Sequence, residues 1–133
     1  MPEREGQRLG NYRLSRLLGK GAFAEVYLGE HLYLKNYAAL KILRTMVRNE
    51  KEEQLFLSEA QMLAQLKHPN IINVREFAVT RATPFLAMDY LPGGTLRQRY
   101  PRGSCLSLEE IINYTKQIAS ALQYAHNHNI YYD

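Results

Sequence analysis

The chain has 133 residues, of which 46% are hydrophobic and 23% are charged, and its formal net charge is +4. This length suits a single compact domain, and the composition excludes disordered, collagen-like and fibrous chains. The basic residues are scattered apart from Arg97, Arg99 and Arg102, so nucleic-acid binding is not expected. No apolar run is long enough to span a bilayer and the one cysteine cannot form an intrachain disulfide, so we expect a cytoplasmic chain without a membrane segment.

The part of the chain up to about residue 92 predicts five strands and one helix. Apolar residues alternate in two strands joined by a glycine-rich turn, and the third strand has apolar residues on both faces, which is typical of a strand buried on both. A helix is expected from about Glu50 to Lys67, and His68 and Pro69 end it. The expected strands cover residues 12–18, 25–30, 37–43, 71–79 and 84–90.

A break over residues 92–94, with the sequence Pro-Gly-Gly, separates this part from a second one. Ser107 is placed to cap a long helix with two glutamates in its first turn. We predict an α+β fold, with one domain over residues 10–92 and an incomplete second one over residues 93–133. The long helix carries an apolar stripe made of Ile111, Ile112, Ile118, Ala119, Leu122 and Ala125.

The glycine-rich turn has the pattern Gly19-x-Gly21-x-x-Ala24. Glycines let backbone N–H groups approach a polyphosphate with no Cβ in the way, so the turn can cradle phosphates. An ordinary hairpin turn is the simpler interpretation of this pattern alone. A dinucleotide-binding turn would need a helix after it, whereas the segment from Val26 to Leu28 is strand-like.

Two charged residues lie in apolar surroundings. Lys41 stands between Leu40 and Ile42 in the third strand, and Glu59 shares a helical face with leucines and a methionine. Burying either charge without a partner is costly, so each needs an opposite charge or access to solvent. Taken alone, each of these long side chains could bury its apolar part and still extend its charged group into solvent. Together, downstream of a glycine loop, they favour a buried ion pair that faces a phosphate.

These residues together resemble the N-terminal lobe of a eukaryotic-type protein kinase, and they are most similar to bacterial serine/threonine kinases. Leu18-Gly-Lys-Gly-Ala-Phe-Ala-Glu-Val26 resembles the family's glycine loop, Ala39-Leu-Lys41 its strand lysine and Glu59 its helix glutamate. The first glycine precedes Lys41 by 22 residues, and Lys41 precedes Glu59 by 18, as in that family. The resemblance implies a kinase-like lobe with a five-stranded antiparallel sheet and one helix, followed by the hinge and the first long helix of a truncated C-terminal lobe.

The resemblance implies a role for each matching residue. Lys41 would contact the α and β phosphates of ATP, and Glu59 would hold its ammonium. Met88 would be the gatekeeper, and the backbone of Asp89 and Leu91 would bond to the adenine edge. Adenine would lie between Leu18, Val26 and Ala39. The loop over the phosphates would comprise Gly19, Lys20, Gly21, Ala22, Phe23 and Ala24, with alanine in the place of the third glycine.

The last residues depart from the family. Tyr124-Ala-His126 matches it, but the chain then continues to Tyr131, Tyr132 and Asp133 in place of Ile-x-His-Arg-Asp. An ungapped alignment, which we favour, puts Asp133 at the arginine of that motif. With one residue deleted, Asp133 falls on the catalytic aspartate without its flanking histidine and arginine. The family's Mg²⁺ ligands, an asparagine and the aspartate of Asp-Phe-Gly, are absent, so no metal-binding residue is expected here.

Two functional interpretations follow from the resemblance. In the first, the chain is the ATP-binding portion of a serine/threonine kinase, cut short and inactive by itself, from a family that uses ATP, Mg²⁺ and a protein substrate. In the second, it is a free-standing module that binds a nucleotide or a partner kinase without catalysis, and the apolar stripe of the long helix is an interface. A relic that does not fold stably is a lesser alternative.

Overall fold

The computed structural model describes residues 4–130 and forms two compact units. Residues up to 65 and residues 73–90 form the first unit. Residues 66–72 and those from 91 onward form the second.

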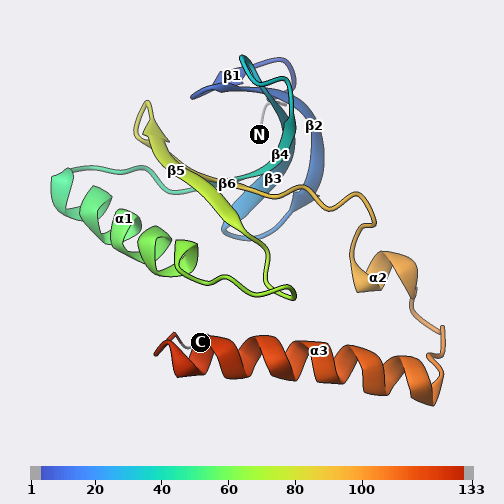
Figure 1. The fold of residues 1–133 in the computed structure, drawn as a ribbon. Coiled ribbons are helices and arrows are strands. Elements are labelled where there is room, and N and C mark those ends of the chain that lie inside the picture. The colour runs from blue at the N-terminus through green and yellow to red at the C-terminus, as the bar shows by residue number, and fades with distance from the viewer. Residues whose placement is uncertain (1–3, 131–133) are drawn as a thin grey trace. The chain divides into compact units, whose positions relative to one another are not determined.

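The first unit is a curled antiparallel sheet accompanied by one helix (Figure 1). Its six strands lie in the order β1-β2-β3-β4-β6-β5. The five predicted strands are confirmed, and the additional one, β1, has two residues, too few for a periodic pattern to show in the sequence. The elements are β1 (Arg8–Leu9), β2 (Tyr12–Lys20), β3 (Ala24–His31), β4 (Tyr37–Leu43), α1 (Glu50–Ala64), β5 (Val74–Thr80) and β6 (Thr83–Met88).

One face of the sheet, the core face, carries the hydrophobic core. Along β4, Ala38, Leu40 and Ile42 are at most 1% exposed. Lys41 between them is exposed, because successive side chains of a strand point to opposite faces. On the face that carries Lys41, which we call the second face, the prediction that this strand is buried on both faces holds for Ala39, which is 7% exposed, and is wrong for Lys41. The core cluster consists of Leu9, Tyr12, Leu14, Tyr27, Ala38, Leu40, Ile42, Phe85 and Ala87.

Helix α1 begins where the sequence predicts. The side chain of Asn49 accepts a hydrogen bond from the Glu52 N–H at 3.0 Å, and acidic residues in the first turn suit the positive end of the helix dipole. The expected apolar stripe is buried only in part: Leu66, just beyond the helix, is 2% exposed and Leu63 is half-buried. Leu55 and Met62 are 61% and 46% exposed, and Ala60 is the buried residue of the helix. The helix packs against β5, and Ala60 lies on the side of the helix that faces this strand.

The second unit contains α2 (Leu96–Arg99) and α3 (Leu108–Asn127). Ser107 caps α3 as predicted, and its hydroxyl and the Glu110 carboxylate satisfy each other's backbone N–H groups. The loop after α1 is tied to α3, since His68 Nε2 lies 3.0 Å from Ser120 Oγ. Helix α2 was not predicted, because four residues show no helical period. Within residues 4–130, no helix is long and apolar enough to cross a membrane.

Candidate functional site

The second face of the sheet brings several of the predicted nucleotide-binding residues together. The strand register places Gly19 opposite Val26, and Val26 opposite Lys41. Ala39, two residues before Lys41, lies opposite Met88. Directly opposed residues of antiparallel strands project on one face with Cβ atoms about 4.5–5.5 Å apart. Four strands therefore contribute to one continuous surface with a lysine, a glycine and apolar side chains.

The buried ion pair between Lys41 and Glu59 is not found. Both residues are exposed, and within residues 4–130 neither of them forms an ion pair. The topology explains this result, since α1 packs against β5, and β6 lies between β5 and β4. The expectation of a buried pair is corrected accordingly: the ammonium of Lys41 is open to solvent on the second face.

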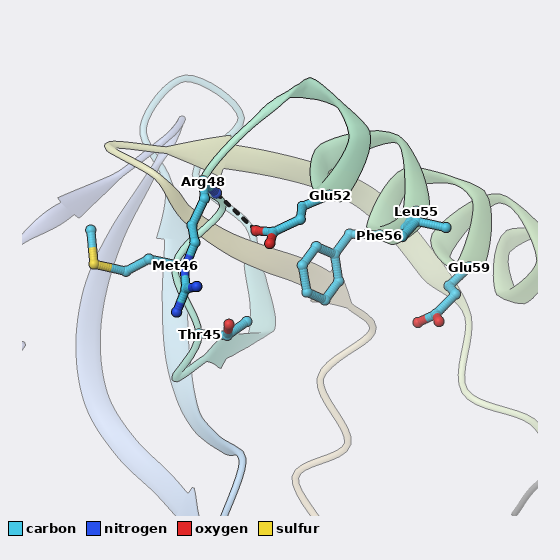
Figure 2. Close-up of a pocket in the computed structure, with 7 residues that line it drawn as sticks. All are labelled: Thr45, Met46, Arg48, Glu52, Leu55, Phe56 and Glu59. Carbon is cyan, nitrogen blue, oxygen red and sulfur yellow. Dashed lines mark hydrogen bonds between the residues drawn. The ribbon is translucent and has the colours of Figure 1, made fainter.

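Glu59 instead opens onto a pocket of about 410 Å³ beside the connection from β4 to α1. Figure 2 shows its carboxylate and the Phe56 ring on the side of α1 that faces this pocket. Across the pocket, the Arg48 N–H donates to Glu52 Oε2 at 2.9 Å and ties the connection to the first turn of the helix. The pocket is lined by Thr45, Met46, Arg48, Glu52, Leu55, Phe56 and Glu59.

The glycine loop between β2 and β3 contains one turn with its own hydrogen bond, and there is free space beside its two glycines. The Gly21 N–H donates to the Ala24 carbonyl at 2.9 Å, and the Arg44 N–H donates to the Phe23 carbonyl at 2.9 Å. A Cβ at Gly19 would meet no atom within 4 Å, and one at Gly21 would meet only the Ala24 carbonyl, at 3.6 Å. Neither glycine has a positive φ. Internal packing therefore does not require these glycines, and the free space fits an approaching phosphate.

The other loop residues, Lys20, Ala22 and Phe23, are exposed, and Phe23 is 85% exposed. Leu18 at the start of the loop is half-buried. Ala24 at its end is buried at the start of β3. The loop thus presents its backbone and three side chains to solvent.

The hinge segment after β6, residues 89–91, already forms hydrogen bonds within the first unit through Asp89. The Asp89 N–H donates to the Asn73 carbonyl at 3.0 Å, so Asp89 can reach an adenine edge only through its own carbonyl. Its side chain accepts from Arg75 Nε at 2.7 Å, and Arg75 also donates to the Tyr37 carbonyl at 3.0 Å. Leu91 is 63% exposed and belongs to the second unit.

Sequence reasoning missed two residues near this site. Arg75 fixes the hinge but looks like an ordinary exposed strand residue, and no local pattern marks it. Glu25 is 3% exposed although it is charged. Its position between Ala24 and Val26, both on the second face, could have shown that it points to the core face.

The sequence predicts no metal-binding residue, because it contains no Asp-Phe-Gly segment. In the described part, no group of three His, Cys, Asp or Glu residues is placed to hold a metal ion. Tyr131, Tyr132 and Asp133, at the departure from the catalytic loop, lie outside the described residues. Cys105 is free and exposed.

Known proteins resemble this chain along nearly its whole length. Residues 12–133 match the family described as protein kinase domain. The chain is 35% identical over 127 residues to serine/threonine-protein kinase PrkC of Bacillus subtilis, covering 94% of this chain and 20% of that protein. It is 32% identical over 121 residues to the probable serine/threonine-protein kinase PknB of Lactococcus lactis, covering 90% and 19%.

A solved structure shows the same fold. A variant of the PknI kinase domain from Mycobacterium tuberculosis superimposes with a TM-score of 0.82 at 30% identity, over 97% of this chain and 53% of that domain. The chain spans about a fifth of the two curated relatives and about half of the solved domain. The chain belongs to the protein kinase family, and it corresponds to part of a kinase domain that resembles those of serine/threonine kinases.

Proposed function

We propose that the first unit binds ATP on its second face. The observation that carries this proposal is the strand register, which sets the Lys41 ammonium in line with Gly19 and Val26. An exposed ammonium beside a glycine turn with free space around it suits a polyphosphate. The apolar Ala39 and Met88 next to it suit the flat face of a purine.

Each residue then has a defined task. Leu18, Val26 and Ala39 enclose adenine, and Met88 limits how deeply the adenine can enter between the strands. The backbone of Asp89 and Leu91 forms hydrogen bonds with the adenine edge. Gly19 through Ala24 cover the phosphates with backbone N–H groups, and Lys41 neutralises the α and β phosphates. ATP supplies a γ-phosphoryl group, which protein kinases transfer to a hydroxyl of a protein substrate.

Glu59 can pair with Lys41 only after it has moved towards β4. Because α1 lies against β5, Glu59 must approach β4 before its carboxylate can hold the Lys41 ammonium. We propose that bound nucleotide favours this approach, since Lys41 is then fixed beside the phosphates and its desolvated charge gains from a partner. Glu59 would thus stabilise the bound state rather than the free one.

For the 133 residues themselves we propose binding rather than phosphoryl transfer. They contain no Asp-Phe-Gly segment to hold Mg²⁺, on which neutralisation of the developing charge depends. A polypeptide that includes the rest of the kinase domain would act on a protein substrate. The alternative role, binding a partner kinase without catalysis, is supported by the exposed apolar residues of α3 such as Ile111 and Ile118, which are 47% and 52% exposed. A cytoplasmic location stays a prediction.

Thermal unfolding with and without Mg-ATP tests the proposal. A ligand at ten times its Kd stabilises a protein by about 1.4 kcal/mol, which raises the Tm of a domain of this size by several degrees. We expect this shift in the parent and in Lys51→Met, which removes an exposed lysine of α1, and its loss in Lys41→Met. No shift in the parent, or the same shift in Lys41→Met, would reject ATP binding at this face. Phosphotransfer measured in parallel would contradict the proposed inactivity of these residues.

A further inference from the structure

A buried carboxylate lies directly behind the glycine loop. Glu25 follows the loop in β3 and is paired with Ile42, a core residue that is 1% exposed. The Glu25 side chain therefore points to the core face, and its neighbours Ala24 and Val26 belong to the second face. It is 4% exposed, so its charge has lost nearly all contact with water.

Two arginines from distant parts of the chain compensate this charge. Arg44 Nη2 lies 3.5 Å from Glu25 Oε1, and Arg4 Nε lies 3.7 Å from Glu25 Oε2. Oε2 accepts no hydrogen bond from a protein group within the described residues, and the ion pair at this oxygen is the one with Arg4. We call these three residues the Glu25 cluster. Removing one arginine leaves a buried carboxylate poorly compensated, which is strongly unfavourable.

Both arginines are also attached to the strand and loop by their backbones. The Arg44 N–H donates to the Phe23 carbonyl at the end of the glycine loop, at 2.9 Å. The Arg4 N–H donates to the hydroxyl of Tyr27 on β3, at 3.2 Å. The Glu25 cluster thus joins the N-terminal segment, the start of the β4–α1 connection and the base of the glycine loop.

Lys20 and Ala24 are paired with neighbouring strands, but the tip of the loop between them, residues 21–23, has little else to hold it. Its own hydrogen bond from Gly21 to Ala24 is local, and the side chains of Lys20, Ala22 and Phe23 are exposed. A segment with few buried contacts opens at a small fraction of the global unfolding free energy. A buried charge cluster at its base therefore affects the loop before it affects the core.

We propose that the Glu25 cluster positions the glycine loop, so that Arg4 in the N-terminal segment controls how well the loop holds phosphates. Arg4 and Glu25 are positioning residues in this account, because neither lies on the second face. The effect on nucleotide affinity rests on the proposed function, whereas the effect on the loop's own order does not.

Hydrogen exchange of the full chain tests the positioning without nucleotide. Arg4→Met should speed exchange at the backbone amides of residues 21–25, and Arg4→Lys, which keeps the charge, should restore part of the protection. Arg8→Met is the control, because it removes an equal charge from the same segment and its side chain bonds to the Gly10 carbonyl instead. Unchanged exchange at residues 21–25 in Arg4→Met, or equal acceleration in Arg8→Met, would overturn the proposal.

Titration with a fluorescent ATP analogue then measures the consequence for binding. Arg4→Met should raise Kd about fivefold, at the lower end of usual coupling between two sites, and Arg8→Met should not. In a double-mutant cycle, Arg4→Met should have no further effect on Kd once Glu25→Gln has removed the shared charge. Equal Kd values in the parent and Arg4→Met would overturn the link to binding. A parent that binds no analogue rejects the ATP site, and the exchange result still decides the positioning.

Discussion

Two glycines of the sheet should respond in opposite ways to the same substitution. A Cβ at Gly29, on the core face, would lie 2.7 Å from Leu40 Cδ1 and 3.1 Å from its Cγ. Leu40 is 0% exposed, so its side chain can give way only by shifting within the core. Overpacking of this kind costs about 1–3 kcal/mol, and the lower chain entropy of the unfolded alanine variant returns about 0.4–1 kcal/mol. Gly29→Ala should therefore destabilise the first unit by about 1–2 kcal/mol.

Gly19→Ala is the matched case on the second face. Its Cβ would meet no atom within 4 Å, so the free energy of unfolding should stay within about 0.5 kcal/mol of the parent. The new methyl group would stand where a phosphate approaches, and ATP affinity should fall about tenfold, equal to about 1.4 kcal/mol.

Urea unfolding followed by near-ultraviolet circular dichroism separates the two variants, because Tyr12 and Tyr27 lie in the core cluster. With a slope of about 1.5 kcal/mol per molar urea, the midpoint of Gly29→Ala should fall by about 1 M. The midpoint of Gly19→Ala should hardly change. If Gly19→Ala lost as much stability as Gly29→Ala, the free space at the loop would be an incorrect description. If Gly29→Ala were neutral, the packing around Leu40 would be looser than the structure has it.

Three further predictions concern the helices. Ser107→Ala removes the cap of α3 and should cost about 1 kcal/mol in thermal unfolding, whereas Ser104→Ala, outside the cap, should not. The hydrogen bonds from Tyr100 and Ser107 lower the pKa of Glu110 below its ordinary value of 4.5. The stability that the ionised Glu110 gives to the folded state is therefore fully present above pH 4.5, and it is lost as the pH falls through the lowered pKa. The helicity of α3 should decline below about pH 4.5, and Glu110→Gln should flatten this dependence; an unchanged profile would contradict it. Glu59→Gln should leave the Tm without nucleotide unchanged, because Glu59 is exposed and forms no ion pair within the described residues, but it should weaken ATP binding. A lower Tm without nucleotide would show that Glu59 has a partner in the free state.

The elements of the fold could be predicted because their signals are local. Alternation identified the strands, and Ser107 with Glu110 marked the start of α3 within one residue. Motif spacing predicted that Gly19, Val26 and Lys41 lie close together, and the strand register pairs Val26 with both of the other residues. That they bind a nucleotide stays a prediction.

The relation between α1 and the sheet could not be predicted in this way. An apolar stripe with Leu55 and Met62 indicates which side of a helix should be buried, yet these two residues are exposed and Ala60 is buried on the side that faces β5. Small residues give no strong hydrophobic signal, although they allow the closest packing. The distance between Glu59 and Lys41 depends on that docking, and no residue pattern within either element encodes it. The partners of the buried Glu25 are likewise distant in sequence, since Arg4 lies 21 residues earlier and Arg44 lies 19 residues later.

Methyl NMR of the alanines tests most directly whether the second face binds nucleotide. Ala24 and Ala39 lie on this face, whereas Ala38 and Ala87 belong to the core cluster on the other one. On titration with Mg-ATP, the methyl signals of Ala39 and Ala24 should move in a saturable manner, with the larger shift at Ala39 beside the adenine ring. The signals of Ala38 and Ala87 should stay in place. A saturable response that leaves Ala39 unmoved, or no response at any alanine, would contradict ATP binding at the second face.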